Sequence, residues 1–290
     1  MQTVSKTWVS GLAAVMLLVV SQLAVADGQQ SVNENRSVSA NEKIYIEVMS
    51  GEIKINAVSG GKFSVVGKLD EKATGYTLDS KDGFTRFEMT MPRQVNYRGN
   101  EKSNGADLRV EVPIGSTLEF KGVNSDVSLS GISGGSKIST VNGKIAAVNL
   151  STLVQLSTVN GEIGSKDNSG QIELSSVNGE IVDVGSSGRL NYSVVNGSIE
   201  ARTSAEEISV STVNGDIKLS GNTVVKGDLI YKPRGKKNSF FGWSNNSKPT
   251  LYIAADAVVE GNIILEQEVE LQIENPAMQA KVITRINDGR

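Results

Sequence analysis

Alternating apolar and polar residues predict β-strands along most of this chain, and in its middle the pattern repeats with a fixed period. The tripeptide Val-Asn-Gly occurs five times, each copy 18 residues after the last, and Val123-Asn124-Ser125 stands one period earlier. The five copies begin at Val141, Val159, Val177, Val195 and Val213. A period kept over six units is typical of a repeat fold whose units stack on one another.

Aligning the six units defines columns of equivalent residues. The residue four before each asparagine is large and apolar: Phe120, Ile138, Leu156, Leu174, Tyr192 and Val210. The residue three after it is β-branched: Val127, Ile145, Ile163, Ile181, Ile199 and Ile217. We expect both columns to face a core, together with the valine directly before each asparagine, while Ser139, Ser157, Ser175, Ser193 and Ser211 face outward.

Two folds are compatible with these columns. In an antiparallel meander, each Asn-Gly pair is the turn of a hairpin, and the valine column falls on the polar face. In a β-solenoid the chain bends at each corner, so that the valines and isoleucines both turn inward. The columns therefore predict an all-β, single-stranded β-helix with 18-residue coils. The uneven spacing of the inward positions argues against the left-handed hexapeptide type, and we expect a right-handed helix.

The asparagine column predicts a structural feature rather than chemistry. Successive coils lie about 4.8 Å apart, so carboxamides in one column can hydrogen-bond along the axis. We expect such a ladder at Asn124, Asn142, Asn160, Asn178, Asn196 and Asn214. Glycine follows five of the six asparagines, and we expect it to relieve a corner with positive φ.

The sequence divides into five segments. They are a signal peptide (1–26), a flexible leader (27–43), an N-terminal β region that caps the stack (44–117), the regular coils (118–221) and irregular C-terminal coils (222–290) with an insertion at 232–248. Within the N-terminal region, Asp82-Gly83 predicts a hairpin turn.

The N-terminus predicts export. Lys6 precedes an apolar run at 11–20 and a small-residue cleavage site at 24–26, and this run is shorter than the ~20 residues that span a bilayer. No later segment is apolar enough to cross a membrane, so we expect a protein of the periplasm or cell surface of a bacterium. Cleavage changes the formal net charge from −3 to −4. A negative net charge disfavours nucleic-acid binding.

Composition narrows the chemistry. The chain has no histidine and no cysteine, which removes thiol nucleophiles, imidazole bases and the usual zinc ligands. We therefore expect no catalytic residues, no metal, no cofactor and no enzymatic activity. The alternative is a polysaccharide-active enzyme that uses Glu162 and Glu180, which fall on adjacent coils. We interpret this pair as part of a solvated edge, because the neighbouring columns are Gly, Ser and Ala.

Two features are candidate binding surfaces. The insertion carries five positive charges and no acid, and its candidate residues are Arg234, Lys236, Lys237, Phe240, Phe241 and Trp243. These bases suit phosphates of an anionic lipid, and the aromatics suit sugar rings or a partner protein, unless the segment is a lid over the coils. The other candidate is an array of hydroxyls, formed by the serine column beside Thr140, Thr158, Ser176 and Thr212. Such rows suit a glycan or ice. The expected partner is an envelope protein, a glycan or an anionic lipid.

The run 51–55, the segment 110–118 and the Val-Asn-Gly-x-Ile coils resemble the bacterial "putative adhesin" domain family, over roughly residues 44–265. The resemblance implies a β-solenoid, export to the envelope and no established chemistry. The strict period and the basic-aromatic insertion depart from the looser repeats of that family. We therefore expect a non-catalytic scaffold or adhesin-like binding protein.

Overall fold

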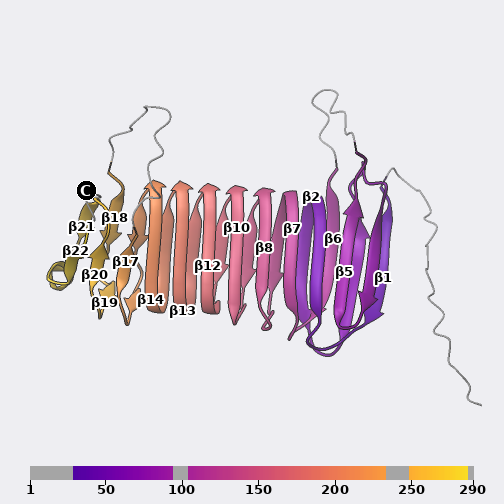
Figure 1. Ribbon diagram of the computed structural model, residues 1–290, viewed down its shortest axis with the longest axis horizontal. Helices are drawn as coiled ribbons and strands as arrows, with labels where there is room; N and C mark the ends of the chain where they lie inside the picture. The colour runs from indigo at the N-terminus through magenta and orange to yellow at the C-terminus, as the bar shows by residue number, and fades with distance from the viewer. Residues whose placement is uncertain (1–28, 94–103, 233–247, 287–290) are drawn as a thin grey trace, which may run out of the picture.

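The computed structural model describes residues 29–93, 104–232 and 248–286. The expected signal peptide and the six candidate residues of the insertion lie outside the described residues. Within them the chain is all-β, with one short helix, and forms an elongated molecule (Figure 1). None of its described helices is long and apolar enough to cross a membrane.

The central coils pair in parallel, each residue lying beside the residue 18 positions later. Leu156 pairs with Ile138 on one side and with Leu174 on the other, and Ile163 pairs with Ile145 and Ile181. The strands are β7 (Thr117–Ser130), β8 (Ser136–Asn142), β9 (Ile145–Val148), β10 (Leu153–Asn160), β11 (Ile163–Lys166), β12 (Ser169–Asn178), β13 (Ile181–Asn196) and β14 (Ile199–Asn214).

These pairings make two faces along the molecule. The serine face, which carries the serine column, runs through β7, β8, β10, β12, β13 and β14. The isoleucine face, which begins three residues after each asparagine, runs through β7, β9, β11, β13 and β14. β7 bends through the asparagine corner, and β13 and β14 bend at the opposite side of the coil, so each of these strands belongs to both faces.

The core lies between the faces. The two apolar columns predicted to be internal are fully or almost fully buried in every central coil. Each such side chain contributes about 1.5–3 kcal/mol when removed from water. One coil cannot offset the cost of ordering its residues, so stability comes from stacking on both neighbours.

The valine column does not face the core, contrary to the prediction. Val123, Val141, Val159, Val177 and Val195 are 36–39% exposed. The in-and-out alternation continues to the corner, so the residue before each valine is the one that turns inward. Thr140 and Thr158 are buried there, and their hydroxyls donate to the carbonyls of Ser125 and Gly143 (3.2 Å each). The valine must then point to solvent.

The prediction of positive φ at the corner glycines is correct for Gly143 and Gly197 (158° and 149°) and wrong for Gly161, Gly179 and Gly215. All five share another constraint. A Cβ at Gly179 would overlap the carbonyl oxygen of Gly161 in the preceding coil, and the other corner glycines meet the same obstacle. Close approach between coils therefore selects glycine even where φ is not positive.

The N-terminal end contains antiparallel pairs. β1 (Ser31–Ser37) pairs with β3 (Lys62–Lys68), which pairs with β6 (Ala106–Pro113), and β4 (Gly75–Lys81) forms a hairpin with β5 (Phe84–Thr90). Asp82 and Gly83 have φ of 53° and 79°, which confirms the predicted turn. Residues 31–37 were expected in a flexible leader, but they form a paired edge strand because Val32 is buried beneath it.

One N-terminal strand belongs to the stack out of sequence order. β2 (Lys43–Val58) lies in parallel register with β7, Ser50 standing beside Asn124, and its other side pairs with β5 and β6. β2 therefore forms a complete bent coil between strands whose paired residues come from 41 (Lys43 to Phe84) to 74 (Lys43 to Thr117) positions later in the chain. The ordered stack thus begins before the first Val-Asn-Gly unit.

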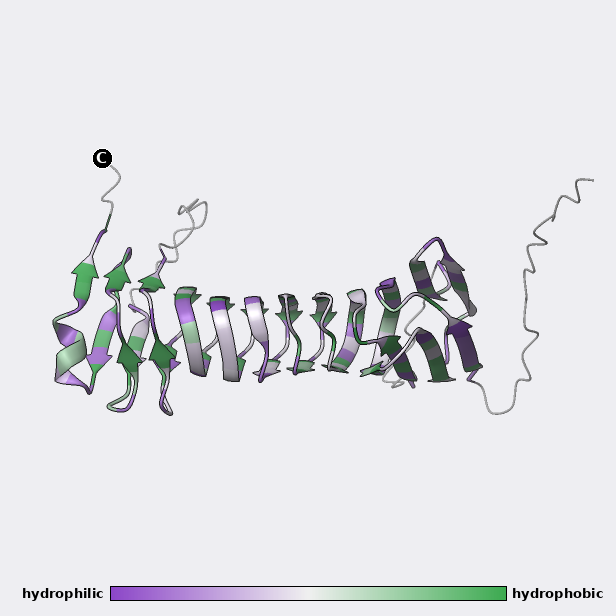
Figure 2. Cartoon of the chain, turned by 90° about the horizontal axis from the view of Figure 1, so that it is seen from below, coloured by the Kyte–Doolittle hydropathy of each residue, from purple (hydrophilic) through white to green (hydrophobic). Residues whose placement is uncertain are grey.

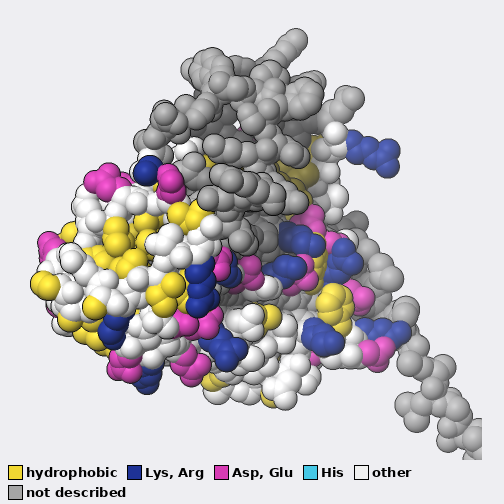
Figure 3. All heavy atoms as spheres, turned by 60° about the vertical axis from the view of Figure 1, so that its left-hand side comes forward, with side chains coloured by type: hydrophobic (Ala, Val, Ile, Leu, Met, Phe, Trp, Pro, Cys, Tyr) yellow, Lys and Arg dark blue, Asp and Glu magenta, His cyan; other side chains and the backbone are white. Residues whose placement is uncertain are grey.

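The C-terminal coils continue both faces with shorter strands. They are β15 (Ile217–Leu219), β16 (Val224–Val225), β17 (Leu229–Tyr231), β18 (Thr250–Ile253), β19 (Val258–Val259), β20 (Ile263–Leu265), β21 (Glu270–Ile273), α1 (Pro276–Gln279) and β22 (Val282–Thr284). Their strands are distinctly hydrophobic, whereas the central coils have intermediate hydropathy (Figure 2). Hydrophobic side chains also gather on the end of the stack that the C-terminal coils form (Figure 3). Ile283, in the last strand β22, is exposed.

Candidate functional site

The serine column lies on the outer side of the serine face. Parallel pairing places Ser139, Ser157, Ser175, Ser193 and Ser211 in consecutive strands, each half-buried. The hydroxyls of Ser139 and Ser157 are 2.8 Å apart and hydrogen-bond to each other. The serine column is therefore a row of small side chains, one in each coil.

The second row of hydroxyls is not on this surface. Thr140, Thr158, Ser176 and Thr212 are only 1–4% exposed. Thr140, Thr158 and Ser176 point inward and donate to backbone carbonyls of the preceding coil, whereas the buried hydroxyl of Thr212 has no partner among the described residues. The exposed hydroxyl array is therefore one column wide, which corrects the prediction of paired rows.

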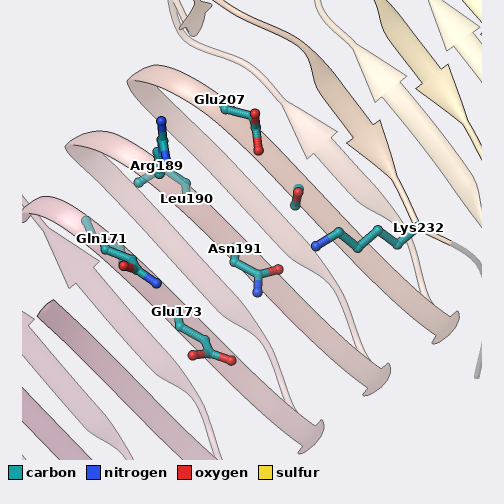
Figure 4. A pocket seen from close by; sticks show the side chains of 9 residues that line it. Gln171, Glu173, Arg189, Leu190, Asn191, Glu207 and Lys232 are labelled. Carbon is teal, nitrogen blue, oxygen red and sulfur yellow. The ribbon is translucent and has the colours of Figure 1, made fainter.

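A hollow of about 210 Å³ opens on the same face, over β12, β13 and β14 (Figure 4). Its polar lining is Gln171, Glu173, Arg189, Asn191, Glu207, Ser209 and Lys232. The first six stand seven and five residues before the asparagines, in two outward columns. One of these columns shortens along the stack, from glutamate through asparagine to serine, and this loss of side-chain volume creates the hollow.

Most polar side chains around the hollow have no partner among the described residues, the exception being Glu173, which accepts a hydrogen bond from Gln155 (3.0 Å). Gln171, Arg189, Asn191, Glu207 and Lys232 form no side-chain hydrogen bond or ion pair with the residues that the structure describes. Elsewhere on the serine face, neighbouring charges do pair: Arg86 with Glu88 (2.5 Å) and Lys121 with Glu119 (3.3 Å). The hollow thus gathers donors and acceptors whose hydrogen-bonding capacity is available.

Ser209 is the buried member of this group. Its side chain lines the hollow, yet the residue is only 6% exposed, and its hydroxyl has no partner among the described residues. Lys232, which directly follows β17, extends across β14 toward Asn191 (Figure 4). The Ser209 hydroxyl is thus a further polar group of the lining to which a ligand in the hollow can hydrogen-bond.

The six asparagines form a continuous row of hydrogen bonds at the corner between the two faces. Each carboxamide nitrogen donates to the carboxamide oxygen of the preceding coil, from Asn142 to Asn124 through to Asn214 to Asn196, at 2.8–2.9 Å. All six side chains lie at the surface. Their amides satisfy one another and stabilise the corner.

The carboxylate pair considered for catalysis lies at this corner as well, outside the hollow. Glu162 forms an ion pair with Lys144 (2.8 Å), and Lys144 also donates its backbone N–H to Asp126. The hydrogen bond to Glu162 raises the pKa of the Lys144 ammonium. Glu180 is exposed on the next coil. The corner therefore carries mixed charge in solvent.

The insertion interrupts this same corner. Thr250 donates its backbone N–H to the carboxylate of Asp216 (3.0 Å), across 34 residues instead of 18. Lys232 and Lys248 mark the described ends of the extra segment. Arg234, Lys236, Lys237, Phe240, Phe241 and Trp243 lie outside the described residues, so their role stays a prediction.

A polar cluster is buried inside the stack, away from the hollow. The Asp183 carboxylate accepts hydrogen bonds from Ser186 (2.5 Å) and Tyr192 (2.7 Å), and the carboxamide of Asn168 donates to Ser165 beside them. Burial raises the pKa of Asp183, although these hydrogen bonds lower it in part. Burial also raises the pKa of Tyr192 well above its usual value. This cluster is structural.

Sequence reasoning did not single out the residues of the hollow. A signal existed: in the aligned repeats, Arg189 and Glu207 are adjacent members of one outward column, and Asn191 and Ser209 of another. That part of the chain which the structure describes contains no group of three or more acidic side chains able to hold a metal ion.

Comparison with known proteins yields distant structural similarity only. No family model matches the chain, and no curated protein matches it. The fold is similar to a "putative cell adhesion protein" from Clostridium sporogenes (TM-score 0.29, 14% identity, 84% of this chain and 100% of that one). It is also similar to a "putative lipid binding protein" from Parabacteroides distasonis (TM-score 0.40, 10% identity, 88% of this chain and 96% of that one). The resemblance to the "putative adhesin" family therefore stays a prediction.

Proposed function

We propose that this chain is an exported, non-catalytic binding protein, in which a β-solenoid presents the serine face to a component of the bacterial envelope. Parallel pairing at 18-residue intervals on two faces supports the solenoid. The right-handed form is part of the proposal, because crossovers between parallel strands are right-handed in nearly all proteins. Export rests on the N-terminal sequence pattern.

The observation that carries the binding role is the hollow. Its polar side chains do not pair with each other, whereas charged neighbours elsewhere on the same face do. Unpaired donors and acceptors that stand together on rigid strands are prepared for an external ligand, because little has to be reorganised on binding.

Cosedimentation of the purified protein with isolated envelope fragments tests this proposal. The double substitution of Ser175 and Ser193 by arginine replaces two small side chains of the serine column with large ones, in the strands that line the hollow. Its control places arginine at Ala146 and Val182, which face outward on the isoleucine face. We expect at least a tenfold loss of bound protein for the serine-face variant and none for the control.

Two results would refute the proposal. Wild-type protein that does not bind the fragments, or binding equal in both double variants, removes the serine face from consideration. Release of reducing ends from an envelope polysaccharide, abolished by Glu207→Gln, would show an enzyme instead of a binding protein.

A further inference from the structure

The hollow combines opposite charges in equal number. Glu173 and Glu207 supply two carboxylates, and Arg189 and Lys232 supply two cations. A polyanion bound here would meet both carboxylates, and a polycation would meet both bases. The balance therefore suits an uncharged ligand.

The same groups offer donors and acceptors in alternation. Arg189 and Lys232 only donate, the carboxylates only accept, and the amides of Gln171 and Asn191 do both. A sugar hydroxyl is at once a donor and an acceptor, so neighbouring hydroxyls of one ring can use both kinds of group. The hydroxyl of Ser209 adds one more donor and acceptor to the lining of the hollow.

The shape of the surface extends the site along the stack. From the hollow, the serine column continues from Ser193 to Ser139, one small side chain per coil, at about 4.8 Å per step. This step is close to the length of one sugar unit in an extended glycan. A linear chain parallel to the axis would thus present one unit to each coil.

From these observations we infer that the hollow and the serine column bind an extended, uncharged polysaccharide. The inference rests on the proposed function and names its ligand class. Hydrogen bonds of several successive units would add along the chain. Binding should therefore strengthen with oligosaccharide length until the five serines are covered, and then stay constant.

Titration calorimetry with uncharged gluco-oligosaccharides of two to six units, in β-1,4, β-1,3 and α-1,4 linkage, tests the inference. A length-matched oligogalacturonate serves as the anionic comparison. We expect binding of one uncharged series to rise with length, and the oligogalacturonate to bind at least tenfold more weakly. Arg189→Ala and Asn191→Ala should each weaken binding about tenfold, whereas Lys166→Ala, an exposed cation at the end of β11 on the isoleucine face, should not change it.

The two proposals fail differently in this experiment. Loss of envelope binding in the Ser175/Ser193 arginine variant, with no binding of any uncharged oligosaccharide, overturns the ligand class and leaves the serine face as a binding surface. Preference for oligogalacturonate, or binding unaffected by Arg189→Ala and Asn191→Ala, also overturns it. Absence of both kinds of binding overturns the proposed function itself.

Discussion

Inside the stack, the phenol of Tyr192 donates a 2.7 Å hydrogen bond to the carboxylate of Asp183. Both residues are completely buried, so the carboxylate is removed from water, and the hydroxyls of Ser186, Tyr192 and Ser165 take the place of its hydration. Such a group costs stability whenever it is charged. The relationship therefore makes the stability of the protein depend on pH.

We expect Asp183→Asn to stabilise the protein at neutral pH. Because the pKa of Asp183 is raised in the folded state, the folded protein binds this proton more tightly than the unfolded chain. Its contribution is fully present below the usual aspartate pKa and is lost as the pH rises through the folded value. If the variant gains about 1 kcal/mol of unfolding free energy at pH 8, its melting temperature there should exceed that of wild type by roughly 2–4 °C. Near pH 4 the two melting temperatures should match.

Thermal melts between pH 4 and pH 8 measure this difference. Asp79→Asn is the control, because Asp79 is an exposed aspartate of β4, in the N-terminal hairpin. Melting curves of wild type and Asp183→Asn that stay parallel across the range would contradict the assignment.

The asparagine row predicts a positional effect. Asn160 takes part in two carboxamide hydrogen bonds, with Asn142 and Asn178, whereas Asn124 takes part in one. Asn160→Ala should cost about 1–2 kcal/mol of unfolding free energy, and Asn124→Ala about half as much, since a net hydrogen bond contributes ~0.5–1.5 kcal/mol. Urea titration measures both. Equal losses would show that the row does not act as a chain of hydrogen bonds.

Glycines at the corner and on a face should respond differently to one added methyl group. A Cβ at Gly179 would overlap the Gly161 carbonyl, whereas one at Gly164 reaches only a 4.0 Å contact with the carbonyl of Ile145. We expect Gly179→Ala to destabilise by about 1–3 kcal/mol or more. Gly164→Ala should change stability by less than about 0.5 kcal/mol. Chemical denaturation compares the pair, and similar values would refute close approach as the reason for the corner glycine.

The exposed valines provide a test of side-chain direction. Val159 is 38% exposed and Ile163 is fully buried, although both were expected inside. Ile163→Ala should cost about 2–5 kcal/mol, and Val159→Ala well under 1 kcal/mol. Comparable losses in unfolding free energy would mean that the valine column is internal after all.

A deletion tests the coil as a unit. Removing residues 142–159 joins Val141 to Asn160 and restores the Val-Asn-Gly corner, so the remaining coils can pair as before. We expect a soluble protein with a cooperative melt. Removing residues 142–150 deletes half a coil, so residues of different columns would have to pair with each other. This deletion should prevent folding. If both deletions melt alike in circular dichroism, register between coils is not what holds the structure together.

The period of the sequence predicted the parallel pairing partner by partner, because equivalent residues at Leu156 and Leu174 must share an environment in a stack. It did not predict the direction of Val159, since the competing inward residue is a threonine whose polar group finds a backbone carbonyl. Hydrophobicity alone ranks valine as the internal residue. Side-chain direction alternates along the strand, however, and this alternation places the threonine inside and the valine outside.

The repeat pattern also did not predict which strands from distant parts of the sequence pair with each other. β2 lacks an asparagine at its corner and carries Ser50-Gly51-Glu52-Ile53 in place of Asn-Gly-x-Ile, so it was not recognised as a coil. The hollow was missed because it depends on side-chain volume in adjacent coils, which no single unit reveals. The place of β2 in the stack and the hollow can be recognised only once the pairing register between strands is known.

The position of β2 has a consequence for the order in which the protein can form. Residues 43–58 leave the ribosome early, but the strands that cover them on both sides end at Thr90, Pro113 and Ser130. Until that later stretch has been synthesised, one or both long borders of β2 are open. β2 is thus synthesised early but acquires its pairing partners late. During that interval it needs protection from self-association.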